Sequence, residues 1–224
     1  PVDKGEIPKA IVRLRELKEG YSILTVTRKG YVKRTAQTDY TNIRSTGIIG
    51  LRLDDGDDLI RAREVRDDQE ILLVTRRGMS IRFNVDDARQ MGRATRGVRG
   101  VRLRDGDEVV GAEVLDEQET ILSVSERGFG KRSSPDEYRI QNRGGTGIIT
   151  IKTTERNGLV AGAIQVFDND NVMLATDGGK IIRTRVEEIP VLSRNTQGVK
   201  LINLEEGERV VGLERLAEDD EDVE

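Results

Sequence analysis

The chain has 224 residues, of which 35% are hydrophobic and 35% are charged, and its 37 basic and 41 acidic residues give a formal net charge of −4. It contains no cysteine and no histidine, which excludes disulfides, thiolate metal sites and the residue type that most often serves as general base or zinc ligand. No apolar stretch approaches the roughly 20 residues of a membrane-spanning helix. We therefore expect a protein of the reducing cytoplasm that has no membrane partner.

Short apolar segments bounded by glycine recur along the chain and predict β-strands. One glycine series marks a turn in each recurrence: Gly30, Gly78, Gly128 and Gly179. Two further series keep step with it: Gly47, Gly97, Gly147 and Gly198, then Gly56, Gly106, Gly158 and Gly207. Three series in step predict a structural repeat of about 50 residues.

In chain order, residues 12–17 match residues 60–65 and predict a terminal strand of a preceding blade within residues 1–19. The repeats then predict blades at 20–68, 69–117, 118–169 and 170–216, followed by an acidic, disordered tail at 217–224. Within a blade, the turn at Gly30 and the Asp55-Gly56 turn, with their counterparts, each predict a hairpin, which gives about four strands. Helical periodicity is missing except for a turn near Asp86 to Met91. The predicted fold is all-β and propeller-like, with about four four-stranded blades.

The charges are not distributed evenly. The segment from Glu218 to Glu224 holds six acids, and without it the balance is 37 basic against 41 − 6 = 35 acidic residues, or +2. The first hairpin of each unit carries bases: Arg28, Lys29, Lys33, Arg34, Arg76, Arg77, Arg82, Arg127, Lys131, Arg132, Lys180, Arg183 and Arg185. The loop before the second glycine series adds Arg44, Arg93, Arg96, Arg143 and Arg194.

Acids such as Asp54, Asp55, Asp57 and Asp58 cluster in the Asp-Gly turns, where turn formation and solubility explain them. Equivalent positions of like blades share one edge of a ring, so we expect bases on one side and acids on another. Such a row of bases suits the backbone of duplex DNA, bound without reading sequence. The alternative is that these bases are solvated strand-edge residues that prevent aggregation.

The stretch QNRGGTG, residues 141 to 147, combines three glycines with one arginine. Glycine-rich loops let backbone N–H groups approach a phosphate while a basic side chain neutralises it. The stretch lacks the closing Gly-Lys-Ser/Thr of a nucleotide-binding P-loop. A turn that uses glycine only for its backbone freedom is the other interpretation.

Several motifs together resemble the C-terminal domain of the DNA gyrase A subunit. They are GYVKRT (30–35), NIRSTGIIGLRLDDGDDLI (42–60), MGRATRGVRGVRL (91–103), YRIQNRGGTGI (138–148) and SRNTQGVKLINLEEGERVVG (193–212). The resemblance covers nearly the whole chain and implies a β-pinwheel, a disc of four-stranded blades joined by strand exchange that wraps DNA around a basic rim. It thereby implies a role in ATP-dependent negative supercoiling.

The family's box, Gln-Arg-Arg-Gly-Gly-Lys-Gly, is matched only in part. Its positions fall on Gln141, Arg143, Gly144, Gly145 and Gly147, with Asn142 and Thr146 replacing basic residues. The box usually lies in the first blade, whereas the first unit here offers only residues 42–47. Since family domains commonly have six blades, the chain resembles the last four, and we expect these box residues to contact DNA together with the bases named above.

The resemblance also implies what the chain lacks. The tyrosine that cleaves DNA in this family lies in a separate preceding region, so Tyr21, Tyr31, Tyr40 and Tyr138 are not expected to be catalytic. No metal or cofactor is expected in this chain, because ATP and Mg²⁺ are handled elsewhere in the holoenzyme, a type II DNA topoisomerase. The implied partners are duplex DNA, the ATPase B subunit of gyrase, plus the rest of the A subunit, in the bacterial nucleoid. The acidic tail is expected to compete with DNA for the bases, or to serve only solubility.

Two other functions stay open. The domain is also similar to the C-terminal domain of the decatenating relative, topoisomerase IV. A propeller-like scaffold that binds an acidic protein is the second, although the chain has no tryptophan and so lacks the Trp-Asp signature of WD-repeat blades.

Overall fold

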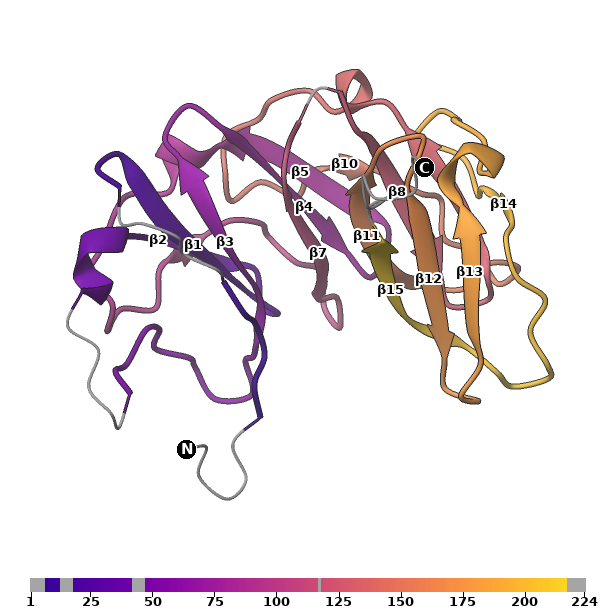
Figure 1. Ribbon diagram of the computed structural model, residues 1–224, viewed down its shortest axis with the longest axis horizontal. Helices are drawn as coiled ribbons and strands as arrows, with labels where there is room; N and C mark the ends of the chain where they lie inside the picture. The colour runs from indigo at the N-terminus through magenta and orange to yellow at the C-terminus, as the bar shows by residue number, and fades with distance from the viewer. Residues whose placement is uncertain (1–6, 13–17, 42–46, 117, 217–224) are drawn as a thin grey trace, which may run out of the picture. The chain divides into compact units, whose positions relative to one another are not determined.

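The computed structural model describes residues 7–12, 18–41, 47–116 and 118–216 (Figure 1). The predicted terminal strand at 12–17 and the acidic tail at 217–224 fall almost entirely outside these residues. Contacts divide the chain into two compact units: unit 1 comprises 1–73, 81–114 and 140–147, and unit 2 comprises 74–80, 115–139 and 148–224.

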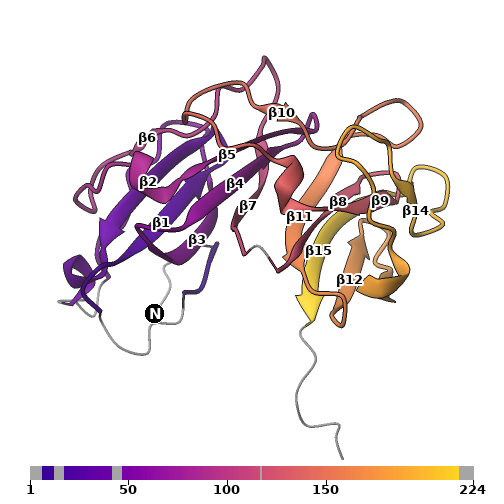
Figure 2. The same cartoon turned by 90° about the horizontal axis from the view of Figure 1, so that it is seen from above.

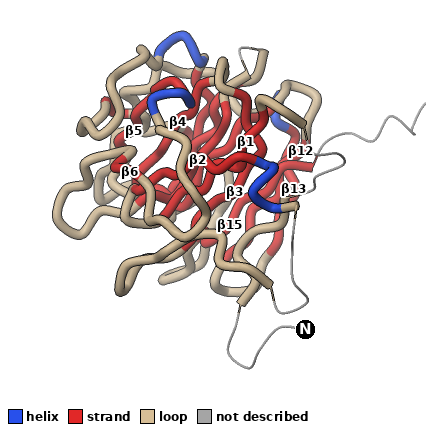
Figure 3. The backbone as a smooth tube through the Cα atoms, turned by 90° about the vertical axis from the view of Figure 1, so that its left-hand side faces the viewer, coloured by secondary structure: helices blue, strands red, loops and turns tan. Residues whose placement is uncertain are grey.

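The described residues form strands and short 3₁₀ turns (Figure 3). The strands are β1 (Tyr21–Thr27), β2 (Tyr31–Ala36), β3 (Leu59–Arg66), β4 (Glu70–Thr75), β5 (Met79–Asn84), β6 (Val98–Arg99), β7 (Val109–Val114), β8 (Thr120–Ser125), β9 (Phe129–Ser133), β10 (Ile148–Ile149), β11 (Val160–Val166), β12 (Asn171–Thr176), β13 (Ile181–Arg185), β14 (Val199–Lys200) and β15 (Val210–Leu216). One 3₁₀ turn follows each hairpin: η1 (Gln37–Tyr40), η2 (Val85–Asp87), η3 (Pro135–Glu137) and η4 (Val186–Glu188). The helical turn predicted near Asp86 is η2. Among these residues, no helix has the length and apolar character needed to cross a membrane.

Each sheet is built on one hairpin. The orders are β3-β1-β2-β6, β10-β5-β4-β7, β11-β8-β9-β14 and, with three strands, β13-β12-β15. In the first sheet, β3 runs antiparallel beside β1, and β1 beside β2 (Figures 1 and 2). The predicted all-β, bladed fold is therefore confirmed, with three strands instead of four in the last sheet.

The fourth strand of each four-stranded sheet comes from the next repeat. Two-residue β6 pairs with β2, β10 with β5, and β14 with β9. The Asp105-Gly106 turn consequently joins β6 of one sheet to β7 of another, so the prediction that the Asp-Gly turns close hairpins is wrong. This is the strand exchange that the resemblance implied.

Glycine is needed where the short strand meets its hairpin. Gly97 has φ 100°, and a Cβ there would collide with the backbone carbonyl of Val32. Gly198 has φ 76°, and a Cβ there would lie 2.5 Å from the carbonyl oxygen of Gly130. Side chains rarely adopt a positive φ, and here they would also have no space. At Gly97 and Gly198, two members of the second series, glycine thus permits the close approach on which strand exchange depends.

Each unit has its own hydrophobic core. In unit 1, Leu24, Val32, Leu73 and Phe83 belong to one buried cluster. In unit 2, Leu122, Val166, Val172 and Leu174 belong to another. Fully burying such a side chain contributes about 1.5–3 kcal/mol, so the cores hold the hairpin faces together and leave the turns and loops to carry the charges.

Candidate nucleic-acid interface

The cations in the second strand of the first three hairpins are largely buried. The side chain of Arg34 is 6% exposed and forms ion pairs with Asp67 and, at 2.9 Å, with Asp86. Arg132 is equally buried, pairs with Asp168 and donates to the Ile189 carbonyl at 2.7 Å.

Arg82, their equivalent in the second repeat, pairs with Glu70, and its side chain is 11% exposed. Arg34 and Arg132 thus hold turns of their own unit, and Arg82 joins β5 to the start of β4. Their contact with DNA stays a prediction that their burial does not favour.

Two predicted lysines are buried completely. Lys33 and Lys131 are both 0% exposed. Lys33 donates to the carbonyl oxygens of Gly50 and Arg93, and Lys131 donates to the Ser133 hydroxyl at 2.5 Å. Burial lowers the pKa of each lysine from 10.5 to about 8, because the charged form loses hydration.

The two other repeats carry Ile81 and Ile182 at the position of these lysines. The position therefore belongs to the interior of the blade, where it accepts either an apolar side chain or a lysine whose ammonium group finds acceptors.

The cations at the hairpin turns and Arg96 of the following loop are more exposed, but acids compensate several of them. Lys180 pairs with Glu205 at 2.8 Å and with Glu208 at 3.1 Å. Arg96 pairs with Asp54 at 2.8 Å. Turn acids therefore lie beside the bases at these positions, so the expectation that the two are segregated is wrong here.

Three further predicted turn cations have partners that differ in kind. Arg76 pairs with Glu126, whereas Arg28 donates to the Gly56 carbonyl at 2.9 Å and has Glu108 at 3.9 Å. Arg127 donates to the carbonyl of Glu155. The exposed members of the predicted set are Lys29, Arg77, Arg96, Arg127, Lys180, Arg183 and Arg185.

Two of the loop arginines, Arg143 and Arg194, bind backbone carbonyls instead of acids. Arg143 donates to the carbonyls of Asp87 at 2.7 Å and Arg99 at 3.2 Å. Its equivalent Arg194 donates to those of Glu137 at 3.1 Å and Ile149 at 2.7 Å. A carbonyl is a neutral acceptor, so each guanidinium anchors its loop and keeps its full positive charge. Arg93 is half-buried, and Arg44 lies outside the described residues.

The stretch 141–147 is tied to the loop before it. The Gly144 N–H, at a residue with φ 78°, donates to the Gly100 carbonyl at 2.6 Å. The Gly145 carbonyl accepts from the Arg102 N–H at 2.8 Å, and the Gln141 N–H donates to the Arg82 carbonyl at 2.8 Å. Gly147 has φ 74°. At Gly144 the glycine thus provides a turn, and its N–H is occupied rather than open to a phosphate.

The structure reveals a row of bases that the sequence predictions missed. Arg52, Arg102 and Lys152 are exposed and occupy the same position in three successive repeats. Their N–H groups donate to the carbonyls of Thr95 at 3.1 Å, Gly145 at 2.8 Å and Thr196 at 2.8 Å. The signal was present in the sequence, because each residue follows a glycine of the second series by five positions.

Each cation of this row therefore lies beside the loop that carries Arg93, Arg143 or Arg194. We call these three pairs, Arg52 with Arg93, Arg102 with Arg143 and Lys152 with Arg194, the paired-cation positions. Two lie in unit 1 and one in unit 2. In the described part of the chain, no group of three or more acids is arranged to hold a metal ion.

Hairpin sheets completed by a strand from the next repeat define a propeller-type repeat domain. The family model described as "DNA gyrase C-terminal domain, beta-propeller" matches residues 21–66, 69–116, 119–166 and 170–217. The chain belongs to this family, which confirms the resemblance seen in the sequence.

The relatives agree with this assignment. The chain is 45% identical over 225 residues to the DNA gyrase A subunit of Salmonella typhimurium, and 43% identical to that of Escherichia coli K12. Each alignment covers all of this chain and 26% of the relative, so the chain spans about a quarter of those proteins.

Two solved structures share the fold. A DNA gyrase A C-terminal domain has TM-score 0.82 and 27% identity, covering 93% of this chain and 70% of that one. A topoisomerase IV C-terminal domain has TM-score 0.85 and 24% identity, covering 91% of this chain and 64% of that one. The second likeness, at lower identity, is a likeness of fold.

Proposed function

We propose that this chain binds and bends duplex DNA without reading its sequence, as the wrapping domain of a gyrase A protein. The observation that carries the proposal is the set of paired-cation positions, at which an exposed base lies beside a loop that carries an arginine. Two of these loop arginines, Arg143 and Arg194, donate to carbonyls. The membership of the gyrase family supports the same function.

Phosphate backbone is the target that this chemistry suits best. Each neutralised phosphate releases condensed counterions, so several weak positions in successive repeats sum to useful affinity. Bending a short duplex site costs on the order of 1 to 6 kcal/mol, which several such contacts offset. The described residues contain only 3₁₀ turns as helices, and aromatic residues make up 3% of the chain, so base recognition by a helix or by stacking is not favoured.

The larger function follows from the parent enzyme. We propose that the chain acts with the rest of the A subunit, where DNA is cleaved, together with the B subunit, which handles ATP and Mg²⁺. In that complex, wrapping presents a crossing segment of the same DNA and supports negative supercoiling in the bacterial cytoplasm.

A salt titration tests whether the exposed bases of the paired-cation positions bind DNA. Affinity for a random-sequence duplex should fall with salt at a slope of about −0.9 per phosphate contacted, in logarithmic units. Replacing Arg52, Arg102 and Lys152 together by alanine should reduce that slope by about 2 to 3 units. The control replaces Arg89, Arg104 and Arg139, which are also exposed and remove the same charge. Equal losses for both triple variants would contradict a defined interface.

A topology assay tests wrapping itself. Nicked circular DNA is ligated with the chain bound, and the linking number is then measured against DNA ligated without protein. A positive shift that grows with protein concentration is the expected result. Tight binding with no shift would leave a DNA-binding domain that does not wrap.

A further inference from the structure

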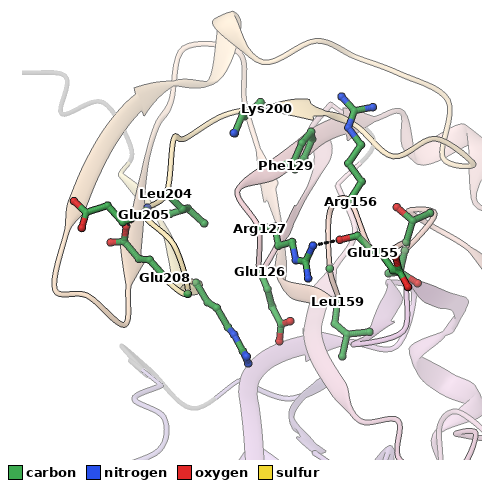
Figure 4. A pocket seen from close by; sticks show the side chains of 15 residues that line it. Glu126, Arg127, Phe129, Glu155, Arg156, Leu159, Lys200, Leu204, Glu205 and Glu208 are labelled. Atoms are coloured by element: carbon green, nitrogen blue, oxygen red, sulfur yellow. Dashed lines mark hydrogen bonds between the residues drawn. The ribbon is translucent and has the colours of Figure 1, made fainter.

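A crevice of about 760 Å³ opens in unit 2, and neither Lys152 nor Arg194 lines it (Figure 4). Three segments line it: the β8–β9 turn at 126–129, the crossing loop at 153–159, and the crossing loop at 204–209, with Lys200 of β14. Figure 4 shows the Phe129 ring between the side chains of Lys200 and Arg156.

The loop at 153–159 differs from its counterparts. Eleven positions separate Gly147 from Gly158, whereas nine separate Gly97 from Gly106 and Gly198 from Gly207. The longer loop folds around the buried side chain of Asn157 and places Arg156 beside the crevice.

The Asn157 side chain is 0% exposed. Its amide nitrogen donates to the carbonyls of Lys152 at 3.0 Å and Gln197 at 3.3 Å. Its amide oxygen accepts from the Thr154 N–H at 2.8 Å and from the Thr154 hydroxyl at 3.0 Å. Four hydrogen bonds fix the loop, so the neighbouring Arg156 projects from a rigid base.

Two cations of the crevice are held by an aromatic ring. The guanidinium carbon of Arg156 lies 4.9 Å from the Phe129 ring centroid, and the Lys200 ammonium lies 5.9 Å from it. Both residues are exposed, and the described part of the chain offers neither of them a carboxylate within ion-pair distance. A ring orients a cation without neutralising it, so the N–H donors of both remain available.

Most of the acids that line the crevice are already compensated. Glu126 pairs with Arg76, and Glu205 pairs with Lys180 at 2.8 Å. Hydrogen bonds from the Thr176 hydroxyl, the Glu205 N–H and Lys180 lower the pKa of Glu208 to about 2. These acids direct their charge at partners within unit 2. Glu155 is the remaining acid of the lining, and it is outnumbered by the lining cations Arg127, Arg156, Lys200 and Arg209, so the excess near Phe129 is positive.

We infer that this crevice is a phosphate-binding site, in which the Arg156 guanidinium and the Lys200 ammonium donate to the oxygens of a phosphate group. A planar guanidinium matches phosphate oxygens in a bidentate arrangement, and the lysine adds a point charge beside it. The phosphate comes either from the backbone of a bound duplex or from a free polyphosphate. The duplex source depends on the proposed function, and the free source does not.

The test uses the 224-residue chain, labelled with ¹⁵N, and two probes: inorganic pyrophosphate and a duplex of about 30 base pairs, long enough to offer the chain several phosphates at once. Pyrophosphate should shift the amide signals of residues 153–158 saturably at constant ionic strength. Arg156→Ala and Lys200→Ala should each weaken this binding about tenfold or more, and Arg156→Lys by less. Arg139→Ala is the matched control, because Arg139 is exposed, lies in the same unit and does not line the crevice.

The outcomes separate the two ideas. Pyrophosphate binding that is lost in both crevice variants and kept in the control supports the site, and a matching loss of duplex affinity identifies the duplex as a source. If duplex still binds but neither probe responds to Arg156→Ala more than to Arg139→Ala, the phosphate site is refuted and the proposed function stands. If no duplex binds while pyrophosphate does, the proposed function fails and the site stands.

Discussion

The substitution Lys131→Ile tests the claim that the lysine position belongs to the interior of the blade. The chain itself places Ile81 and Ile182 at this position, and Ile81 is 0% exposed. We expect the variant to be more stable than the parent chain at pH 7. It should also lose part of the pH dependence of the parent chain.

The magnitude follows from the pKa. A fall from 10.5 to about 8 in the folded state corresponds to about 3 kcal/mol of destabilisation at pH 7, at about 1.36 kcal/mol per pKa unit. Losing the hydrogen bond between Lys131 and Ser133 offsets about 1 kcal/mol of the gain. The net stabilisation of Lys131→Ile is therefore about 2 kcal/mol.

The pH dependence has a defined sign. Between pH 8 and 10.5 the unfolded lysine holds its proton and the folded one releases it, so the parent chain gains stability as the pH rises. About 2 kcal/mol of the penalty should disappear between about pH 7 and pH 9.5 for this lysine. The advantage of Lys131→Ile over the parent should shrink by the same amount.

Urea unfolding of both chains at about pH 7 and pH 9.5 gives the measurement. Lys33→Ile is the contrasting variant, because it relieves a similar penalty but leaves the two carbonyls of Gly50 and Arg93 without their donor, so it should gain less stability than Lys131→Ile. A Lys131→Ile chain that is less stable at pH 7, or whose advantage is the same at both pH values, would refute the reasoning.

Three further changes have defined expectations. Gly97→Ala should destabilise the chain by about 2 to 4 kcal/mol in chemical unfolding, because it adds strain at a positive φ to a collision with the Val32 carbonyl; an unchanged midpoint would contradict the close approach. Arg143→Gln should weaken duplex binding and also let the amide hydrogens of the 141–147 loop exchange faster, since the guanidinium anchors that loop to two carbonyls. Weaker binding with unchanged amide exchange would contradict the role of Arg143 in holding the loop. Deleting residues 217–224 should tighten duplex binding at low salt and not at high salt, because six acids no longer compete for the bases; equal affinity at low salt would count against competition.

The fold was predictable because it repeats. Glycines in three series mark the turns, and their spacing gives the length of the blade without any coordinates. The partner of each short strand was not predictable from the residues alone, because Val98 and Arg99 are equally compatible with a local hairpin. Only the pairing of β6 with β2 shows that the strand crosses to the preceding hairpin.

The candidate interface was predictable in kind and less so in detail. Sequence position identifies a cation but not its partner, and the partner decides what the cation can do. Arg34 and Arg143 are both arginines of the repeat, yet one pairs with two carboxylates and the other with two carbonyls. Arg52 and Arg102 belong to none of the clusters of bases from which the interface was predicted, and their significance comes from recurrence at a single position.

The kind of partner that each cation has decides its electrostatic effect on a ligand. A cation paired with a carboxylate contributes almost no net field at the distance of a ligand. A cation bonded to carbonyls or to an aromatic ring keeps its charge and loses only its freedom to move. Arg143 and Arg156 are of this second kind, held by backbone oxygens and by Phe129 respectively. A pre-oriented charge loses less entropy when it binds a phosphate. Each such residue should therefore contribute more to the affinity for nucleic acid than a cation that is paired with a carboxylate.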